Sequence, residues 1–243
     1  MTREPLERLF HSLNDDRLSY VVARKYETLP AVPADGDVDI YVAADEFETL
    51  LDSCERAEFE NSAASTASDS LALLDRAVRR PVTATTMLLQ SPQTVFRLVR
   101  GDTMHRQNYR NRKLFCDGIM LDISNHLAYT SPMDETRIRV DPSIEQRMLD
   151  RRRRHNGFYV PAPVDELAHI VPHCVFDKQG DFSDYYVDRC DSLVQQLMSD
   201  GNSSELRRLF SDLFYEAGDL VYDLVLSGEY SVIRSRLRSF DEY

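Results

Sequence analysis

Lysine, paired cysteines and long apolar runs are what this sequence has least of. Its four cysteines lie far apart without a C-x-x-C pair, so we expect neither a cysteine zinc site nor a disulfide framework. No apolar run approaches the roughly 18 residues that a membrane span needs. The amino-terminal stretch MTREPLERLFHSLNDD is amphipathic and charged, unlike a signal peptide. We therefore expect a soluble, cytoplasmic protein with no membrane partner.

The charge of the chain is strongly biased. Of its 29 basic residues only three are lysines (Lys25, Lys113 and Lys178), and the 41 acidic residues leave a net charge of −12. This bias resembles cytoplasmic proteins of salt-loving archaea, whose densely carboxylated surfaces stay soluble in concentrated salt. The negative charge disfavours a nucleic-acid partner, although salt screening weakens that repulsion.

The pattern of apolar residues predicts two parts. At 243 residues and 42% hydrophobic content the chain can bury a substantial core. We predict an α+β fold, with a small mixed β-sheet flanked by helices over 1–140 and a helical bundle over 141–243. In the first part we predict helices over 5–13, 44–59 and 71–78, strands over 18–23 and 37–42, and a hairpin over 112–129. In the second part we predict helices over 144–153, 164–176, 182–198, 205–227 and 231–240.

Two aspartates open the second predicted strand, DVDIYV. Asp37 and Asp39 are one residue apart, so on an extended backbone both carboxylates point to one face, with Cα atoms roughly 6.5 Å apart. Unpaired carboxylates placed this way repel each other and are costly to bury. Bound Mg²⁺ or Mn²⁺ removes that cost, although in an Asp-rich chain the pair can also simply be solvated. Asp35 and Asp117 each precede a glycine and are expected to be turn residues.

Asp122 lies inside MLDIS, a predicted strand whose neighbours are apolar. Three strand-borne aspartates, two as D-x-D and one on a later strand, resemble the nucleotidyltransferase superfamily with its polymerase-β-like fold. The stretches YVVARKYETLP…GDVDIYV, LDISNHLAY and PVDELAHIVPHCVFDKQGDFSDYYVDRCDSL are similar to uncharacterised nucleotidyltransferase-fold proteins that often accompany surface-polysaccharide genes.

The resemblance implies metal-dependent transfer of a nucleoside monophosphate from a nucleoside triphosphate to an acceptor. It implies that Asp37 and Asp39 bind the nucleotide-associated metal, and that Asp122 completes a second metal site and orients or activates the attacking hydroxyl. The acceptor stays open among a sugar phosphate, a small metabolite, a protein and an RNA end.

One stretch departs from the superfamily pattern. A Gly-Ser pair usually precedes the D-x-D strand and holds the triphosphate, whereas this chain has Arg24-Lys25-Tyr26-Glu27. Arg24 or Lys25 can substitute by pairing with phosphate. Otherwise the chain is a catalytically inactive nucleotide-binding or scaffold module of the same fold. A third interpretation is a toxin-type nucleotidyltransferase acting on tRNA, which needs an antitoxin partner.

The helical region holds further candidates. Glu166, His169 and His173 share one helical face and could form a metal site, but Pro172 disturbs the helix and no further ligand is evident. We favour a hydrogen-bonded structural role, or for His173 a place lining the cleft toward the nucleotide. Lys178 either meets a phosphate or ends a helix at the surface.

Two other features have a structural and a functional interpretation. Tyr185 and Tyr186 can stack on a base, but packing within the bundle is favoured. The basic run 151–154, with Arg147 one turn earlier, is expected to be a solvated helix end rather than a polyphosphate or RNA contact.

Overall fold

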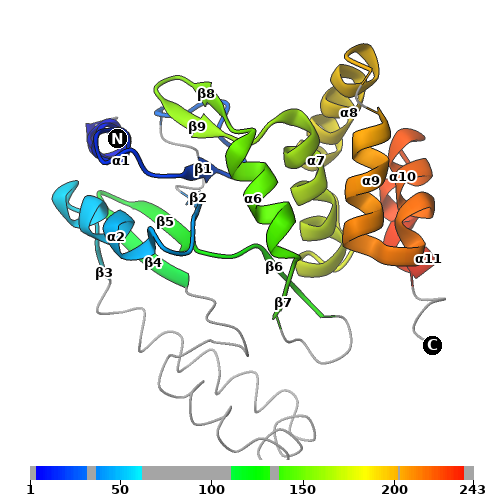
Figure 1. Cartoon of the computed structure of the whole chain (residues 1–243), viewed down its shortest axis with the longest axis horizontal. Helices are drawn as coiled ribbons and strands as arrows, with labels where there is room; N and C mark the ends of the chain where they lie inside the picture. The colour runs from blue at the N-terminus through cyan, green and yellow to red at the C-terminus, as the bar shows by residue number, and fades with distance from the viewer. Residues whose placement is uncertain (1–3, 32–36, 62–110, 132–136, 202, 238–243) are drawn as a thin grey trace, which may run out of the picture.

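The computed structural model describes residues 4–31, 37–61, 111–131, 137–201 and 203–237. Within them the fold is α+β, as the sequence predicts: a small mixed sheet with flanking helices comes first, and helices follow (Figure 1). The predicted helix over 71–78 and the predicted turn at Asp35 lie outside the described residues. In the described ranges no helix combines the length and apolar character needed to cross a bilayer.

The sheet has five strands in the order β1-β2-β5-β4-β3. The pairing of β2 with β5 is parallel, and the other neighbours are antiparallel. The predicted hairpin is present: Asp117 and Gly118 both have positive φ angles, 50° and 80°, as the two central residues of a tight hairpin turn require. The strands are β1 (Tyr20–Val22), β2 (Asp37–Val42), β3 (Glu60–Asn61), β4 (Asn111–Cys116) and β5 (Ile119–Ser124).

Two helices contribute to the core of the sheet part. Helix α1 (Glu4–Asp15) turns Leu6, Leu9 and Leu13 into this core, and α2 (Phe47–Arg56) adds its own apolar face. Both helices were predicted, from the spacing of about 3.6 residues between their apolar positions. The same core contains Phe158 and Val160, so it extends past residue 140, and the division of the chain there stays a prediction.

The second part of the chain is helical apart from two short hairpins. A π-helical turn over His173–Asp177 continues the helix that contains Pro172, since proline removes one backbone donor there. The elements are β6 (Ala128–Thr130), β7 (Arg137–Arg139), α6 (Pro142–Asp150), β8 (Arg153–His155), β9 (Phe158–Val160), α7 (Pro163–Pro172), α8 (Asp184–Ser199), α9 (Ser203–Phe214), α10 (Gly218–Leu226) and α11 (Ile233–Leu237).

Two sequence-based predictions need correction in this part. The expected helix over 205–227 is two helices, α9 and α10, which pack so closely that a Cβ on Gly218 would lie 2.5 Å from Ser211 Cα. The basic run is a helix end only in part: Arg151 is the C-cap of α6, whereas Arg153 and Arg154 are exposed residues of β8. Arg151 Nε donates to Asp165 Oδ2 at 3.0 Å.

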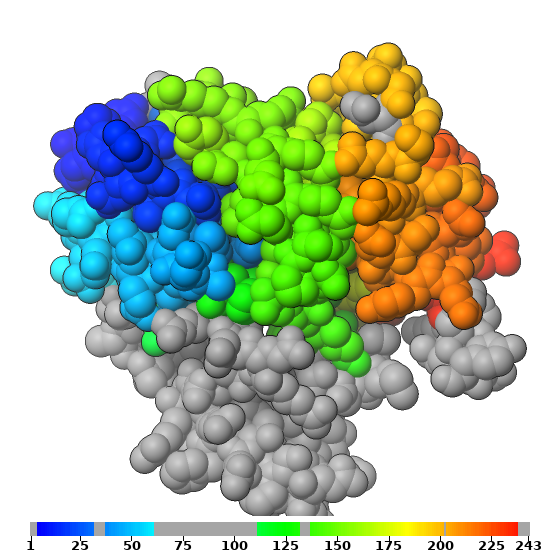
Figure 2. All heavy atoms as spheres, in the orientation of Figure 1, coloured from blue at the N-terminus to red at the C-terminus, as the bar shows by residue number. Residues whose placement is uncertain are grey.

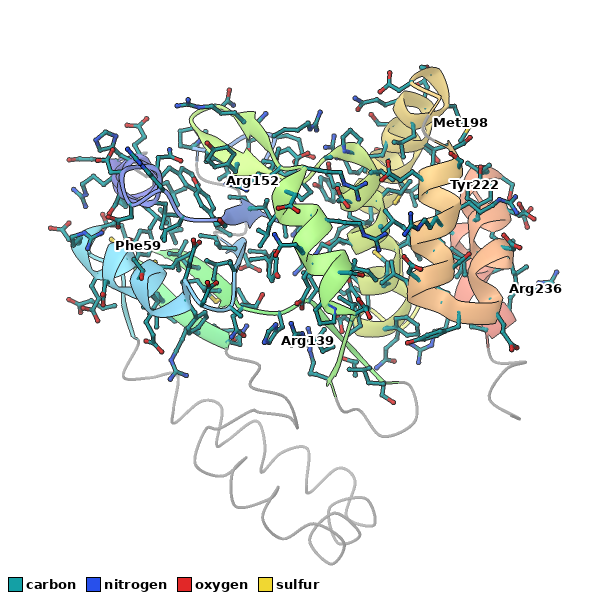
Figure 3. The ribbon with its side chains drawn as sticks, viewed as in Figure 1. Phe59, Arg139, Arg152, Met198, Tyr222 and Arg236 are labelled. Atoms are coloured by element: carbon teal, nitrogen blue, oxygen red, sulfur yellow. The ribbon has the colours of Figure 1, made fainter. Side chains whose placement is uncertain are left out.

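The β8–β9 hairpin and α6 lie between the two parts of the fold. In the space-filling view, the green residues of these elements separate the blue and cyan amino-terminal elements from the orange helices (Figure 2). Arg152, just after α6, places its guanidinium 5.0 Å from the ring centre of Tyr159 on β9 (Figure 3). This contact is a cation–π interaction, so Arg152 packs within this connecting region, whereas Arg153 and Arg154 are exposed.

A buried network ties the loop after β1 to helices α7 and α8. Arg189 donates to both oxygens of the fully buried Glu166, at 2.6 and 2.7 Å, and to the Tyr26 hydroxyl at 2.6 Å. The Tyr26 hydroxyl in turn donates to Glu166. One residue earlier, the backbone N–H of Lys25 donates to the Tyr185 hydroxyl at 3.1 Å. The loop that carries Arg24 is therefore fixed by the helical part of the chain.

Replacing Arg189 with methionine should lower the free energy of unfolding by about 3–5 kcal/mol, because Glu166 would keep a buried charge without its partner. Tyr26→Phe, which removes one hydroxyl, should cost about 1 kcal/mol. Urea unfolding of each variant measures both losses. Arg189→Met combined with Glu166→Gln should recover part of the loss, and a double variant as unstable as Arg189→Met alone would argue against charge burial as the cause.

Candidate functional site

The parallel pairing of β2 and β5 brings the three predicted aspartates together. Asp39 lies directly beside Asp122 in the strand register, and Asp37 is two residues earlier on the same strand face. The alternating residues Val38 and Leu121 are buried in the core on the opposite face. Three carboxylates therefore occupy one face of two adjacent strands, close to the start of β2.

Arg24 is the counter-charge of Asp39. Its Nε donates to Asp39 Oδ2 at 2.7 Å and its Nη2 to Oδ1 at 2.9 Å. The two side chains are only 16% and 15% exposed. Burial alone would raise the pKa of Asp39, but the hydrogen bonds and charge of Arg24 hold it below its ordinary value. The Arg24 Nη1 atom is buried and has no hydrogen-bond partner.

Asp37 and Asp122 carry the excess charge of the cluster. Burial, together with the charges of Asp39 and Asp122, raises the pKa of Asp37 to about 6. Its Oδ1 atom is buried without a hydrogen-bond partner. Burial also raises the pKa of Asp122, opposed by a hydrogen bond from the Asn111 side chain on β4. Arg24 and the more exposed Lys113, which lies beside Asp122 in the strand register, thus face three acidic groups, and the cluster still has capacity for a further cation.

The chemistry of this donor set fits Mg²⁺ or Mn²⁺, which bind carboxylate oxygens. Among the described residues, however, no three His, Cys, Asp or Glu side chains are arranged to hold a metal ion. Arg24 engages both oxygens of the central carboxylate, Asp39. For Asp39 to take part in metal binding, the guanidinium of Arg24 has to leave it.

A second group of polar side chains comes from α7 and the π-helical turn. His173 Nδ1 lies 3.0 Å from Asp177 Oδ2, and His169 Nδ1 lies 2.9 Å from the Tyr129 hydroxyl. The two imidazole rings stack with centres 6.2 Å apart. Burial and then the charge of Arg24 lower the pKa of both histidines, that of His169 to about 3. Both rings are therefore neutral at pH 7 and lie within the electrostatic reach of Arg24.

The zinc interpretation of Glu166, His169 and His173 is not supported. Glu166 is held by Arg189 and Tyr26, away from the two histidines' partners, and the described residues contain no metal-binding group of three. His169 and His173 are hydrogen-bonded, as their structural interpretation expects.

The remaining candidates lie in the loop after β1 and in the helical part of the chain. Lys25 takes a left-handed backbone conformation, φ 55°. Glycine adopts this conformation most easily, but here the turn forms with a lysine. Lys178 is exposed at the end of the π-helical turn. Tyr186 is buried, with its ring 5.8 Å from that of His173, and Tyr185 hydrogen-bonds Glu27. The two tyrosines pack, as favoured.

Sequence reasoning missed three contributors to the site. Asn111 could have been predicted from the sequence, because the hairpin turn at residues 117–118 sets a register that brings Asn111 near Asp122. Asp177 stands four residues after His173, a helical spacing that signals contact. Arg189 gave no local signal, since its partner Glu166 is on another helix.

No protein-family model, curated protein or solved structure matches this chain. The functional interpretation therefore depends on the chemistry of the site.

The stability of the protein should fall in acid partly because of Asp177. Burial would raise its pKa, but hydrogen bonds from His173 and the Thr130 backbone, together with the charge of Arg137, lower it from 3.8 to about 2. A depressed pKa stabilises the fold above about pH 4, and the contribution is lost as pH falls toward 2. It amounts to about 2 kcal/mol.

Denaturant unfolding at a series of pH values tests this. Asp177→Asn should be less stable than the parent at pH 6 and should lose less stability between pH 5 and 3. Asp219→Asn, which removes an exposed partner of Arg207, should behave like the parent. Parallel pH dependence of the parent and Asp177→Asn would contradict the prediction.

Arg24→Gln should lower the free energy of unfolding by about 3 kcal/mol, because it leaves Asp39 partly buried without a counter-charge. If the cluster accepts a divalent cation, millimolar Mg²⁺ should raise the melting temperature of Arg24→Gln more than that of the parent. Arg8→Gln, which breaks an exposed ion pair with Glu58, is the control and should cost under about 1 kcal/mol. Equal responses of all three proteins to Mg²⁺ would count against a cation site.

Proposed function

We propose that this protein is a metal-dependent nucleotidyltransferase that moves a nucleoside monophosphate from a nucleoside triphosphate to an acceptor. The observation that carries the proposal is the β2–β5 register, which sets Asp39 beside Asp122 with Asp37 on the same face. Attack on an α-phosphate develops negative charge on the entering and leaving oxygens. Closely spaced carboxylates that are not fully neutralised can bind the metal ions that stabilise this charge.

Asp37, Asp39 and Asp122 would hold Mg²⁺ or Mn²⁺, which when bound supplies positive charge for the α-phosphate and the leaving pyrophosphate. The unpartnered Oδ1 of Asp37 and the raised pKa values of Asp37 and Asp122 support this assignment. Carboxylates that are strained by mutual repulsion gain most from a cation.

Arg24 takes the role that the Gly-Ser pair has in the resembling superfamily. It neutralises Asp39 through two hydrogen bonds. With a cation bound by Asp39 instead, the planar donors of Arg24 would be available for a phosphate, which they match in a bidentate manner. The backbone next to it is fixed, because the Lys25 N–H and the Tyr26 side chain are bound by α7 and α8. The arginine therefore starts its movement from a defined position.

The second candidate function is an inactive nucleotide-binding or scaffold module. The observation in its favour is the same Arg24–Asp39 pair, which blocks the central carboxylate as long as it persists. The two candidates differ in turnover: both bind a nucleotide, but only the enzyme transfers label from it.

The test is incubation of the purified protein with α-³²P-labelled nucleoside triphosphates, Mg²⁺ and cell extract as the source of acceptor. We expect label on an acceptor, and a loss of about 100-fold or more with Asp37→Asn. Because the pKa of Asp37 is raised to about 6, the neutral amide relieves repulsion, so this variant should be at least as stable as the parent. Loss of activity then reflects chemistry, not unfolding.

Asp52→Asn, a change of an exposed carboxylate on α2, is the matched control and should transfer label at the parent rate. Nucleotide binding without transfer by the parent protein would favour the inactive module. Full activity in Asp37→Asn would remove the carboxylate cluster from the mechanism.

A further inference from the structure

A carboxylate–imidazole pair is built into the π-helical turn after α7. Asp177 accepts hydrogen bonds from His173 Nδ1 at 3.0 Å, from the Thr130 backbone N–H at 2.9 Å and hydroxyl at 2.8 Å, and from Arg137 Nη1 at 2.9 Å. An ionised carboxylate only accepts, so the shared proton belongs to Nδ1 of the imidazole. The other ring nitrogen, Nε2, is left with a lone pair.

The Nε2 atom of His173 is buried and without a hydrogen-bond partner, in a side chain only 8% exposed. A buried polar atom of this kind calls for a group that it can bind. The ring lies 5.8 Å from that of Tyr186 and stacks on His169, and its charge state responds to Arg24 and Asp39. Tyr186 in turn interacts with Arg24, so Tyr186 is a common neighbour of the imidazole and of the Arg24–Asp39 pair.

Two other buried atoms of the same neighbourhood lack partners: the donor Arg24 Nη1 and the acceptor Asp37 Oδ1. A hydroxyl group can donate its one hydrogen bond to His173 Nε2, whereas Asp37 Oδ1 is left for the cation of the proposed function. A carboxylate or a fully ionised phosphate complements Nε2 poorly, because it has no proton to donate.

From this arrangement we infer that His173 is the general base for the acceptor, and that the acceptor is an alcohol rather than a phosphate ester. The inference rests on the proposed nucleotidyl transfer and specifies its second substrate. The acceptor O–H bond breaks and its proton passes to Nε2, while the oxygen forms a bond to the α-phosphorus. The bond from the α-phosphorus to the bridging oxygen breaks, and its electron pair leaves on pyrophosphate.

The choice of an alcohol follows from what a base contributes. An alcohol holds its proton at neutral pH and gains from proton removal during attack, typically about 10²–10⁴-fold. A phosphate monoester is largely ionised already, with its second pKa near 6, and needs no base. Asp177 acts as a positioning residue: it orients the ring and stabilises the imidazolium that forms, as in other carboxylate–imidazole pairs.

Asp122 is less suited to that proton transfer. One of its oxygens accepts a hydrogen bond from Asn111, and in the proposed reaction its lone pairs are committed to a cation. His173, which is within electrostatic reach of Arg24 and Asp39, has no competing contact at Nε2 among the described residues. The proton therefore passes to a group that does not bind the cation, His173, on the helical side of the site.

The first experiment compares His173→Gln with His11→Gln in the labelled-nucleotide assay. His11 and Asp15 are four residues apart in the sequence, like His173 and Asp177, and His11 Nε2 lies 3.2 Å from Asp15 Oδ2. This pair is on the surface of α1, where the side chains are 80% and 66% exposed. We expect His173→Gln to lower kcat by about 100-fold or more, with unchanged binding of a fluorescent nucleoside triphosphate. His11→Gln should match the parent protein.

The linkage in the product is read by ³¹P NMR. An alcohol acceptor gives a phosphodiester with one uncoupled phosphorus resonance, whereas a phosphate acceptor gives a P–O–P linkage with two coupled resonances. A coupled pair, or near-parental kcat in His173→Gln, would overturn the inference and leave the proposed nucleotidyl transfer intact. Absence of transfer by the parent protein would overturn both.

A second measurement does not depend on activity. Two-bond ¹H–¹⁵N spectra of the metal-free protein at pH 7 should show His173 as the neutral tautomer protonated on Nδ1. Asp177→Asn should remove this preference and lower kcat while nucleotide binding persists. An imidazolium signal, or a tautomer protonated on Nε2, would exclude His173 as the proton acceptor even if its replacement slows the reaction.

Discussion

The parallel pairing of β2 with β5 is the constraint on which the rest of this molecule depends. Val38, Ile40, Leu121 and Ile123 are almost completely buried on one face of these strands. A slip of one residue would turn them toward the opposite face and drive the aspartates into the core. The hydrophobic register thus fixes the carboxylates beside one another, despite their mutual repulsion.

That repulsion shapes the surrounding structure. A cluster with three carboxylates needs a nearby positive group, and Arg24 supplies it from the end of β1. Arg24 itself needs a fixed backbone, which the left-handed conformation of Lys25 and the network of Tyr26, Glu166 and Arg189 provide. The arginine that balances the acidic cluster on the sheet is therefore held in place by contacts with the helical part of the chain.

The sequence was sufficient to predict what local patterns control. Alternation of Asp37 and Asp39 with apolar residues gave the shared strand face, and Asp117-Gly118 gave the hairpin. The α+β class followed from the change of period along the chain. The pairing of Arg24 with Asp39 was not predicted, because an arginine after a strand fits a phosphate ligand equally well. The β8 strand was missed because four consecutive arginines carry no apolar alternation, and their packing depends on Tyr159 and Asp165.

Synthesis of the chain on a ribosome adds a consequence of the long-range network. Tyr26 and Arg189 are 163 positions apart, and Lys25 and Tyr185 are 160 apart. The strands that carry the aspartates emerge well before α8, so a nascent chain holds the acidic cluster while the segment bearing Arg24 still lacks its anchors. Completion of the site is thereby deferred until most of the polypeptide has been translated, and a prematurely terminated product would retain the acids without a fixed counter-ion.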